Sequence, residues 1–359
     1  MSNILSFTPR PKGTATAAGP EALSVMFANQ RRARGDVFWL KENAEWLGIL
    51  ASMSVDGIDA ALDPYAAFYD TIRRQLEFFP QYYRFYLSIC LDLEDLGAGG
   101  TQGEALCHWV AAQGLVEAEL SDLQRGEAAR LLARRGVQTK CHAAGLGDRL
   151  QNFIARPRTF AVPNKKAAYE LAHIVFYLSD YGRCDPGVAP EALTSLEYAG
   201  LLAFLDQDID LLSEICAALR LAGAVPSPIW ERLVVEAHAN CTMICGAPGA
   251  SDVYHGYLVT GWLTHLVDRP AFNHAVPTGQ VSVHGAMVGQ GALRGLSESL
   301  FELGPKRLPD WPRMRQTLTD HLSGVEQSVI ALAEQSSPRF EAFFQGFSRA
   351  CSGAMTSLA

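Results

Sequence analysis

Residues 165–181 read KKAAYELAHIVFYLSDY, and this stretch decides the fold class. After its two lysines, apolar and aromatic side chains occupy most helical positions and cover nearly all sides of a helix. Residues 81–96, QYYRFYLSICLDLEDL, show the same pattern. A helix that is apolar on every side is buried on every side. Both stretches therefore predict inner helices that other helices surround.

Other helical stretches keep a polar face and are predicted to lie on the outside. Residues 126–135 and 312–335 are two examples. Inner helices wrapped by outer ones predict an all-α fold, a multilayer helical domain arranged as an α/α toroid or as a solenoid of helical hairpins. The sequence shows no fixed repeat period, so it leaves both arrangements open.

We expect a disordered segment at residues 1–20, followed by a single large helical domain over residues 21–359. A sub-boundary is placed near residues 156–165. Residues 268–311, rich in Gly and Pro, are interpreted as an irregular insert with a β-like run at 280–283. Helices are predicted at 21–34, 37–51, 63–79, 81–96, 103–113, 116–124, 126–135, 145–155, 165–181, 191–205, 208–221, 228–245, 252–267, 293–302, 312–335 and 339–351.

Composition limits the possible function classes. The 359-residue chain is 48% hydrophobic and only 19% charged, which predicts a large core and excludes wholesale disorder. A net charge of −8 argues against a nucleic-acid partner or an anionic membrane surface, and no apolar run approaches the roughly 18 residues of a membrane span. Eight cysteines in so long a chain are not typical of a disulfide framework, and residues 1–20 show no secretion signal. We therefore expect a cytoplasmic protein.

Polar side chains inside the apolar helices are the most informative feature for function. They form stripes at helical spacing. The members are Glu170, His173, Tyr177 and Asp180; Arg84, Ser88, Asp92 and Asp95; and Asp252 with His255, beside Tyr254 and Tyr257. An unpaired ionisable group in such a core costs several kcal/mol. The stripes are therefore expected to supply partners to one another.

Two interpretations of this polar centre remain open. In the functional one, His173, Asp180 and His255 converge as catalytic acid and base or as metal ligands. The substrate-binding residues would then be Arg84, Asp92, Tyr177 and Tyr254. In the structural one, the same groups form a satisfied network of hydrogen bonds and ion pairs that fixes the fold.

These interpretations lead to two hypotheses of function. The first is a small-molecule-binding protein or enzyme whose ligand occupies a cavity among the inner helices. The second is a helical scaffold that binds a protein partner through an exposed groove. The sequence identifies no cofactor, metal, substrate or reaction.

A separate acidic group follows at residues 206–214. The run DQDID at residues 206–210 resembles the start of a calcium loop, but Leu211 stands where that loop requires Gly, and no Glu occupies its twelfth position. We interpret Asp208 as a helix cap, and Asp210 and Glu214 as charges that the dipole favours in the first turns.

Three stretches resemble known families. The segments FFPQYYRF and LDLEDLG, within residues 78–97, and YELAHIVFYLSDYG at 169–182 are similar to segments of uncharacterised, mainly helical bacterial proteins. The stretch DVYHGYLVTG at 252–261 resembles the D-x-Y-H segment of the α/α-toroid protein prenyltransferases, although its His-to-Gly spacing is one residue shorter. In that family the His is a zinc ligand, and His255 is the matching position. The resemblance implies an all-α fold and transfers no activity.

Overall fold

The computed structural model describes residues 15–53, 57–140, 144–285 and 289–350, and helices dominate them. The predicted all-α, multilayer fold is confirmed. The helices that build the main body are α1 (Pro20–Val25), α2 (Val37–Ser52), α3 (Asp59–Leu62), α4 (Ala66–Tyr69), α5 (Ile72–Phe78), α6 (Tyr83–Asp95), α7 (Gln102–Ala112), α8 (Asp122–Ala133), α10 (Leu146–Ile154), α11 (Pro157–Phe160), α12 (Lys165–Leu178), α13 (Pro190–Asp206), α14 (Ile209–Leu221), α15 (Pro228–Ala239) and α16 (Tyr254–Leu266).

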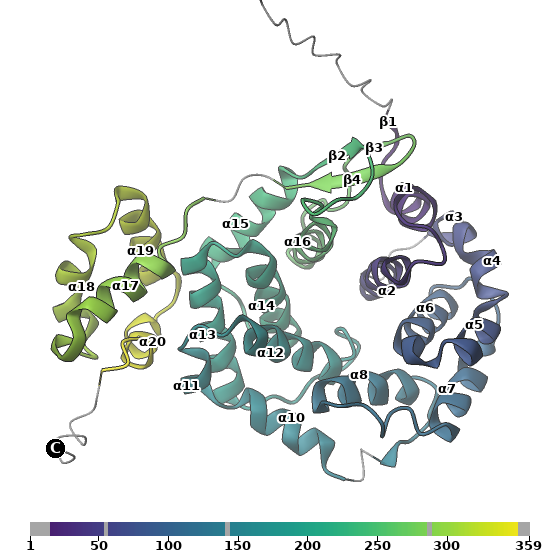
Figure 1. The fold of residues 1–359 in the computed structure, drawn as a ribbon, viewed down its shortest axis with the longest axis horizontal. Helices are drawn as coiled ribbons and strands as arrows, with labels where there is room; N and C mark the ends of the chain where they lie inside the picture. Colours follow the sequence, from purple (N-terminus) through teal and green to yellow (C-terminus); the bar gives the residue numbers. More distant parts are fainter. Residues whose placement is uncertain (1–14, 54–56, 141–143, 286–288, 351–359) are drawn as a thin grey trace, which may run out of the picture.

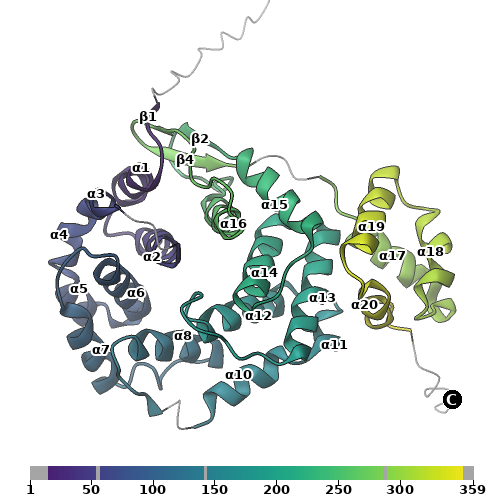
Figure 2. The ribbon, with the colours of Figure 1, turned by 180° about the vertical axis from the view of Figure 1, so that it is seen from behind.

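Six helices form a closed inner ring. Each packs against the next in the order α2, α6, α8, α12, α14 and α16, and α16 packs against α2 again. Figures 1 and 2 show this ring from its two sides. Because the ring closes on itself, the inner helices form a toroid rather than an open solenoid.

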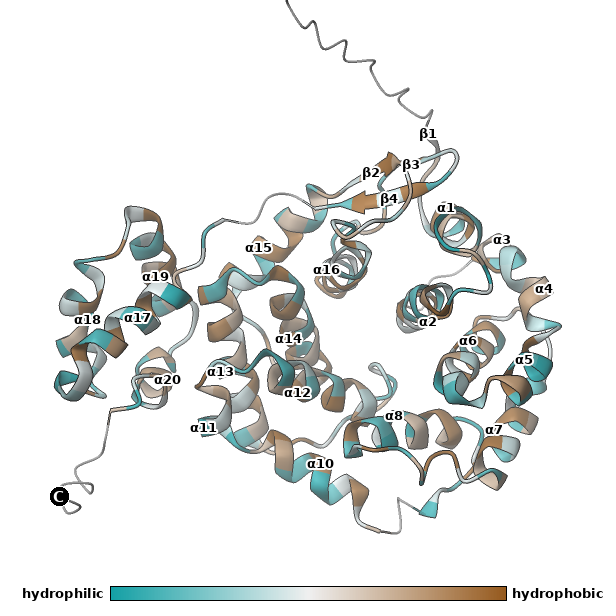
Figure 3. Cartoon of the chain, viewed as in Figure 1, coloured by the Kyte–Doolittle hydropathy of each residue, from teal (hydrophilic) through white to brown (hydrophobic). Residues whose placement is uncertain are grey.

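Each outer helix packs over the contact between two neighbouring inner helices. Helix α7 contacts α6 and α8, α10 contacts α8 and α12, α13 contacts α12 and α14, and α15 contacts α14 and α16. An inner helix is consequently enclosed on most sides: α14 buries every residue from Leu211 to Leu219, and most of its ribbon is hydrophobic in Figure 3. The apolar patterning of residues 81–96 and 165–181 predicts this enclosure. The expectation that residues 126–135 lie on the outside is wrong, because most of them belong to the inner helix α8, which packs between α6 and α12.

Side-chain caps fix where four of the inner helices begin, and Ser121 caps α8. Asp208 accepts a hydrogen bond from the backbone N–H of Leu211 at the start of α14, which confirms its predicted role. Asp36 and Asn164 cap α2 and α12 in the same way. The predicted helix at residues 63–79 is instead broken into short pieces, and Asp63 makes no capping hydrogen bond.

Short strands cross one edge of the ring (Figure 1). Strand β2 (Thr242–Cys245) pairs antiparallel with β4 (Val281–His284), so that Thr242 lies opposite His284 and Cys245 opposite Val281. Strand β4 confirms the β-like run predicted at 280–283. The helix predicted over residues 228–245 is wrong beyond Ala239, because backbone pairing with β4 takes residues 242–245 into a strand.

The expected disorder of residues 1–20 is corrected in part. Residues 1–14 lie outside the described residues. Strand β1 (Ala15–Ala17) pairs antiparallel with β3 (Val276–Pro277), and helix α1 starts at Pro20. Pairing with a segment about 260 positions away cannot be recognised from local composition.

Four helices form a group beside the ring, against α13 and α15 (Figures 1 and 2). They are α17 (Leu293–Leu303), α18 (Trp311–Thr319), α19 (Gly324–Ser336) and α20 (Phe340–Phe347).

The single helix predicted over 312–335 is wrong, because Ser323 starts a new helix through a capping box with Glu326. The insert expected at 268–311 contains β3, β4 and α17, and the domain division stays a prediction. None of the described helices is long and apolar enough to cross a membrane.

Candidate functional site

A cavity of about 160 Å³ lies inside the inner ring, and all six inner helices contribute to its wall. The apolar part of the wall consists of Ala44, Gly48, Ile49, Phe85, Phe176, Leu258, Val259 and Trp262. The polar part consists of Glu45, Ser88, Asp92, Glu127, Arg130, His173, Tyr177, Tyr181, Arg183, Glu214 and His255. An apolar and aromatic cavity with convergent polar groups has the composition of a small-molecule site.

Glu214 of α14 is the polar group buried most deeply in this wall. Its side chain is 2% exposed, and two histidines from the neighbouring helices approach it. His173 Nε2 of α12 lies 3.3 Å from Oε2, and His255 Nε2 of α16 lies 3.5 Å from Oε1. Among the described residues, however, none donates a hydrogen bond of good geometry to Oε2. A buried carboxylate oxygen without a hydrogen bond carries a desolvation cost, which makes it a candidate for contacting a ligand.

Asp210, one helical turn before Glu214, extends the cluster. Its Oδ2 lies 2.7 Å from His255 Nδ1, and its Oδ1 accepts a hydrogen bond of 3.1 Å from the Tyr169 hydroxyl of α12. Residues four positions apart on a helix share a face. Asp210 and Glu214 therefore approach the two ring nitrogens of His255 from the same helix.

The carboxylates change the acid–base properties of the histidines. Burial alone would lower the pKa of His255, but its hydrogen bond to Asp210 and the charges of Asp210, Glu45 and Glu214 raise that pKa to about 9. His173 has its pKa lowered by burial and raised by the negative charge of Glu214, and the net direction is upward. Burial raises the pKa of Glu45. Both imidazoles thus favour the charged form beside Glu214.

A turn after α12 completes the wall. Asp180 and Tyr181 have φ angles of 45° and 55°, left-handed values that residues other than Gly adopt at a cost. Arg130 of α8 holds this turn, because its guanidinium donates a 2.7 Å hydrogen bond to Asp180 Oδ1 and lies 4.9 Å from the Tyr181 ring centre. The turn places Tyr181 and Arg183 in the cavity wall.

The structure brings together two of the three predicted catalytic residues. His173 and His255 both meet Glu214, whereas Asp180 is paired with Arg130 and Arg183 and makes no described contact with either histidine. The expected convergence is therefore wrong for Asp180. To share the face of His173 at i+7, Asp180 would need the helix to continue through it, but α12 ends at Leu178.

The predicted substrate-binding residues are divided between the wall and its surroundings. Tyr177 and Asp92 line the cavity. Arg84 lies outside the described wall and forms an ion pair with Glu127, which belongs to it. Tyr254 also lies outside it, with its ring centre 5.3 Å from the Arg31 guanidinium.

Sequence reasoning missed Asp210 and Glu214. Asp210 does lie in the first turn of α14, as expected, but both residues also contact His255, which the interpretation as dipole charges did not include. The available signal was Glu214 itself, a charge in the middle of the apolar run Leu211–Leu219 at a four-residue spacing from Asp210. Only the position of α16 beside α14 shows which partner they meet.

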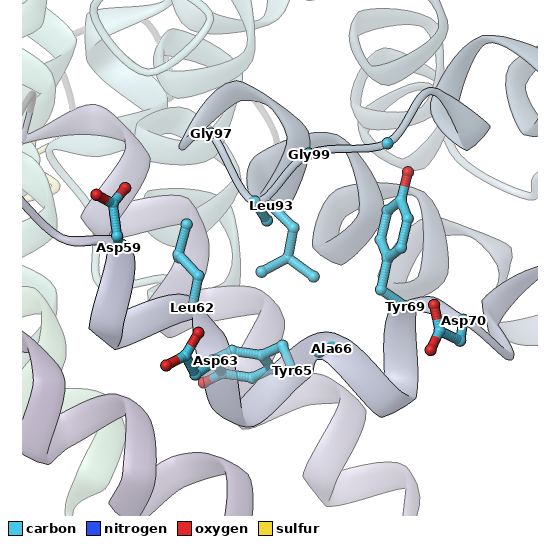
Figure 4. A pocket seen from close by; sticks show the side chains of 12 residues that line it. Asp59, Leu62, Asp63, Tyr65, Ala66, Tyr69, Asp70, Leu93, Gly97 and Gly99 are labelled. Atoms are coloured by element: carbon cyan, nitrogen blue, oxygen red, sulfur yellow. The ribbon is translucent and has the colours of Figure 1, made fainter.

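A larger groove of about 530 Å³ lies elsewhere, between α3–α4 and the glycine-rich loop after α6 (Figure 4). Its acidic residues Asp59, Asp63 and Asp70 are exposed, so water solvates their carboxylates. Tyr69 projects beside the loop and donates a hydrogen bond to Glu94. With no orphaned buried polar atom described in its wall, this groove is a weaker candidate than the cavity in the ring.

Residues 1–350 match the family described as a domain of unknown function, DUF6902. The chain belongs to this family. The match agrees with the predicted membership of a mainly helical family without an assigned activity. Neither a curated protein nor a solved structure matches the chain.

The cluster gives this DUF6902 protein two chemical capacities. Imidazoles beside a buried carboxylate can exchange protons with a bound molecule. Asp210, Glu214 and His255 also each offer one ligand atom, and these atoms lie within 4.8 Å of one another, close enough to surround a metal ion.

Proposed function

We propose that this protein binds a small organic molecule in the cavity of the inner ring and acts on it with the cluster of Asp210, Glu214, His173 and His255. The observation that carries this proposal is the Oε2 atom of Glu214. It is buried, and His173 Nε2 lies 3.3 Å away without hydrogen-bond geometry; no other donor among the described residues reaches it. A structural network would be expected to satisfy such an atom within the protein, whereas a binding site leaves it for the ligand.

The cavity limits the size and character of the ligand. A volume of about 160 Å³ suits a molecule near the size of one aromatic ring, since an engineered apolar cavity of roughly 150 Å³ binds benzene. Phe176 and Trp262 pack edge to face, with 5.0 Å between ring centres, and offer apolar surface for such a ring. A polar substituent on the ligand would then meet Glu214 and the histidines.

Filling the cavity tests this proposal without removing a polar group. Gly48 lines the cavity from α2, and a Cβ added there would lie 3.6 Å from Asp92 Oδ2, an ordinary van der Waals distance. The larger side chain of Gly48→Leu would occupy cavity volume, and Leu favours a helix more than Gly does. Gly324→Leu, at an open and exposed helical position, is the matched control.

The readout is saturation-transfer NMR with phenol, benzylamine and benzoate as probes that differ in their polar group. We expect at least one probe to bind the wild-type protein and the Gly324→Leu control, and to lose binding in Gly48→Leu. The proposal is contradicted if no probe binds, or if Gly48→Leu binds the probes as the wild type does. The polar centre would then be structural, and the result would favour the hypothesis of a scaffold that binds a protein partner.

We also propose a cytoplasmic location. Support comes from the cysteines of the described residues, which are all free. Unpaired thiols suit a reducing compartment. Cell fractionation tests this location, and recovery of the protein from an oxidising compartment would contradict it.

A further inference from the structure

We propose that Asp210, Glu214 and His255 bind a first-row divalent transition-metal ion at the wall of the ring cavity, with His173 and Tyr169 orienting the two carboxylates. This inference rests on the proposed function, because the metal would be the group that meets the bound molecule. No prediction made from the sequence included Asp210 or Glu214 in a site.

The geometry supplies the donor set. One donor atom from each of the three residues lies within 4.8 Å of the other two, and the donors come from the adjacent helices α14 and α16. Asp210 and Glu214 are one helical turn apart, so a single rigid element sets both carboxylates. Donors on packed helices are held more precisely than donors on loops.

Burial separates this group from an ordinary acidic cluster. The Glu214 side chain is 2% exposed and lines the cavity, and among the described residues no donor reaches its Oε2 with hydrogen-bond geometry, although His173 Nε2 lies 3.3 Å away. Glu45 of α2, whose charge acts on both His255 and Glu214, adds a third carboxylate to the surroundings. With His255 deprotonated to act as a ligand, a divalent cation would replace the imidazolium as the counter-charge of these carboxylates and complete the coordination of Glu214.

Contacts outside the donor set also suit a metal centre. Ligating carboxylates are usually fixed by a second hydrogen-bonding or charged group. Tyr169 donates a hydrogen bond to Asp210 Oδ1, which also lies 3.1 Å from His255 Nδ1, and His173 Nε2 lies 3.3 Å from Glu214 Oε2. Each carboxylate thus has a group that sets its orientation.

The donor types narrow the choice of metal. One imidazole nitrogen with two carboxylates suits Zn²⁺, Mn²⁺, Fe²⁺ or Co²⁺, whereas Ca²⁺ and Mg²⁺ prefer oxygen donors alone. Three protein ligands leave a coordination position open, as in sites where a metal contacts water or a substrate. The bound ion would act as a Lewis acid toward a polar group of the molecule in the cavity.

The test uses the full-length protein, stripped of metal with a chelator and held at one mildly alkaline pH. Co²⁺ is followed by its visible absorption and Zn²⁺ by titration calorimetry. We expect one ion per chain, with affinity reduced about a hundredfold or more in Glu214→Gln and Asp210→Asn, substitutions that keep side-chain shape and remove a charged ligand. His173→Ala should weaken binding by roughly tenfold to a hundredfold, because it removes an orienting group and leaves the ligands in place.

Two controls keep the result decisive. His108→Ala changes an exposed histidine outside the cluster and should bind both metals as the wild type does. Far-UV circular dichroism establishes that each variant is folded, and if Asp210→Asn does not fold, Glu214→Gln alone decides.

The proposal is overturned if the wild type binds neither ion beyond the level set by nonspecific sites, or if folded Glu214→Gln binds Co²⁺ as tightly as the wild type does. Failure here is distinguishable from failure of the proposed function. Probe binding that Gly48→Leu abolishes, in a protein that binds no metal, would leave the small-molecule site standing and remove only the metal.

Discussion

His255 of α16 points its Nδ1 atom at Oδ2 of Asp210 on α14, at a distance of 2.7 Å. The two residues are 45 positions apart in the sequence, and they meet because α14 and α16 are neighbours in the inner ring. This contact orients the imidazole so that Nε2 is left to face Glu214. Asp210 also accepts a hydrogen bond from the Tyr169 hydroxyl of α12, so one carboxylate connects three inner helices.

Stability should fall in mild acid because of His238. Burial, with a smaller effect from His274, lowers the pKa of His238 from 6.5 to about 3. As the pH falls from about 6.5 to about 3, His238 therefore becomes protonated in the unfolded chain but stays neutral in the folded protein. The free energy of unfolding should decrease over this interval by up to about 1.4 kcal/mol per pH unit from this group. Urea unfolding of wild type and His238→Gln at several pH values measures it, and the variant should show the shallower slope; equal slopes would refute the assignment.

Arg31→Met should strongly destabilise the fold. The Arg31 side chain is fully buried, and it pairs with Glu42 at 2.7 Å and with Asp252 at 2.8 Å. Its removal leaves buried carboxylates without their main counter-charge, at a cost of about 3–5 kcal/mol. Arg73→Met removes an exposed pair with Glu77 and should cost less than about 1 kcal/mol. Denaturant unfolding of both variants checks the difference, and similar losses would contradict it.

Asp180→Asn should weaken the turn that carries Tyr181. Asn tolerates the left-handed conformation, so the substitution removes mainly the charge that Arg130 requires. We expect a loss of about 1–3 kcal/mol in the free energy of unfolding and weaker binding of the cavity probes. Asp70→Asn, on the exposed groove, is the control. Thermal melting and probe titration measure the two effects, and wild-type values for both would show that Asp180 does not hold the turn.

Gly261→Ala tests the close packing of α16. An added Cβ would clash with the ring of the buried Phe272 and would lie 2.8 Å from the His238 ring. Overpacking of this kind costs about 1–3 kcal/mol. Gly324→Ala meets open space and should leave the melting temperature near the wild-type value. A Gly261→Ala variant as stable as the wild type would show that Phe272 can move aside.

The predicted inner helices were correct because helical periodicity is a local property. The apolar residues on all sides of 165–181 require neighbours around that helix, whatever those neighbours are. The Asp208 cap is local in the same sense, since it contacts the N–H of Leu211 three residues later. Residues 15–17 and 242–245 were mispredicted because their strands exist only through pairing with distant segments.

The sequence alone placed His173 and His255 on apolar helices, and it required partners for them because a buried charge cannot remain unpaired. It could not name those partners, since periodicity assigns a residue to a face of its helix and not to the helix opposite. Closure of the ring put α14 between α12 and α16, and that packing made Asp210 and Glu214 the partners. Asp180 instead forms an ion pair with Arg130, because α12 ends before Asp180 can share the face of His173.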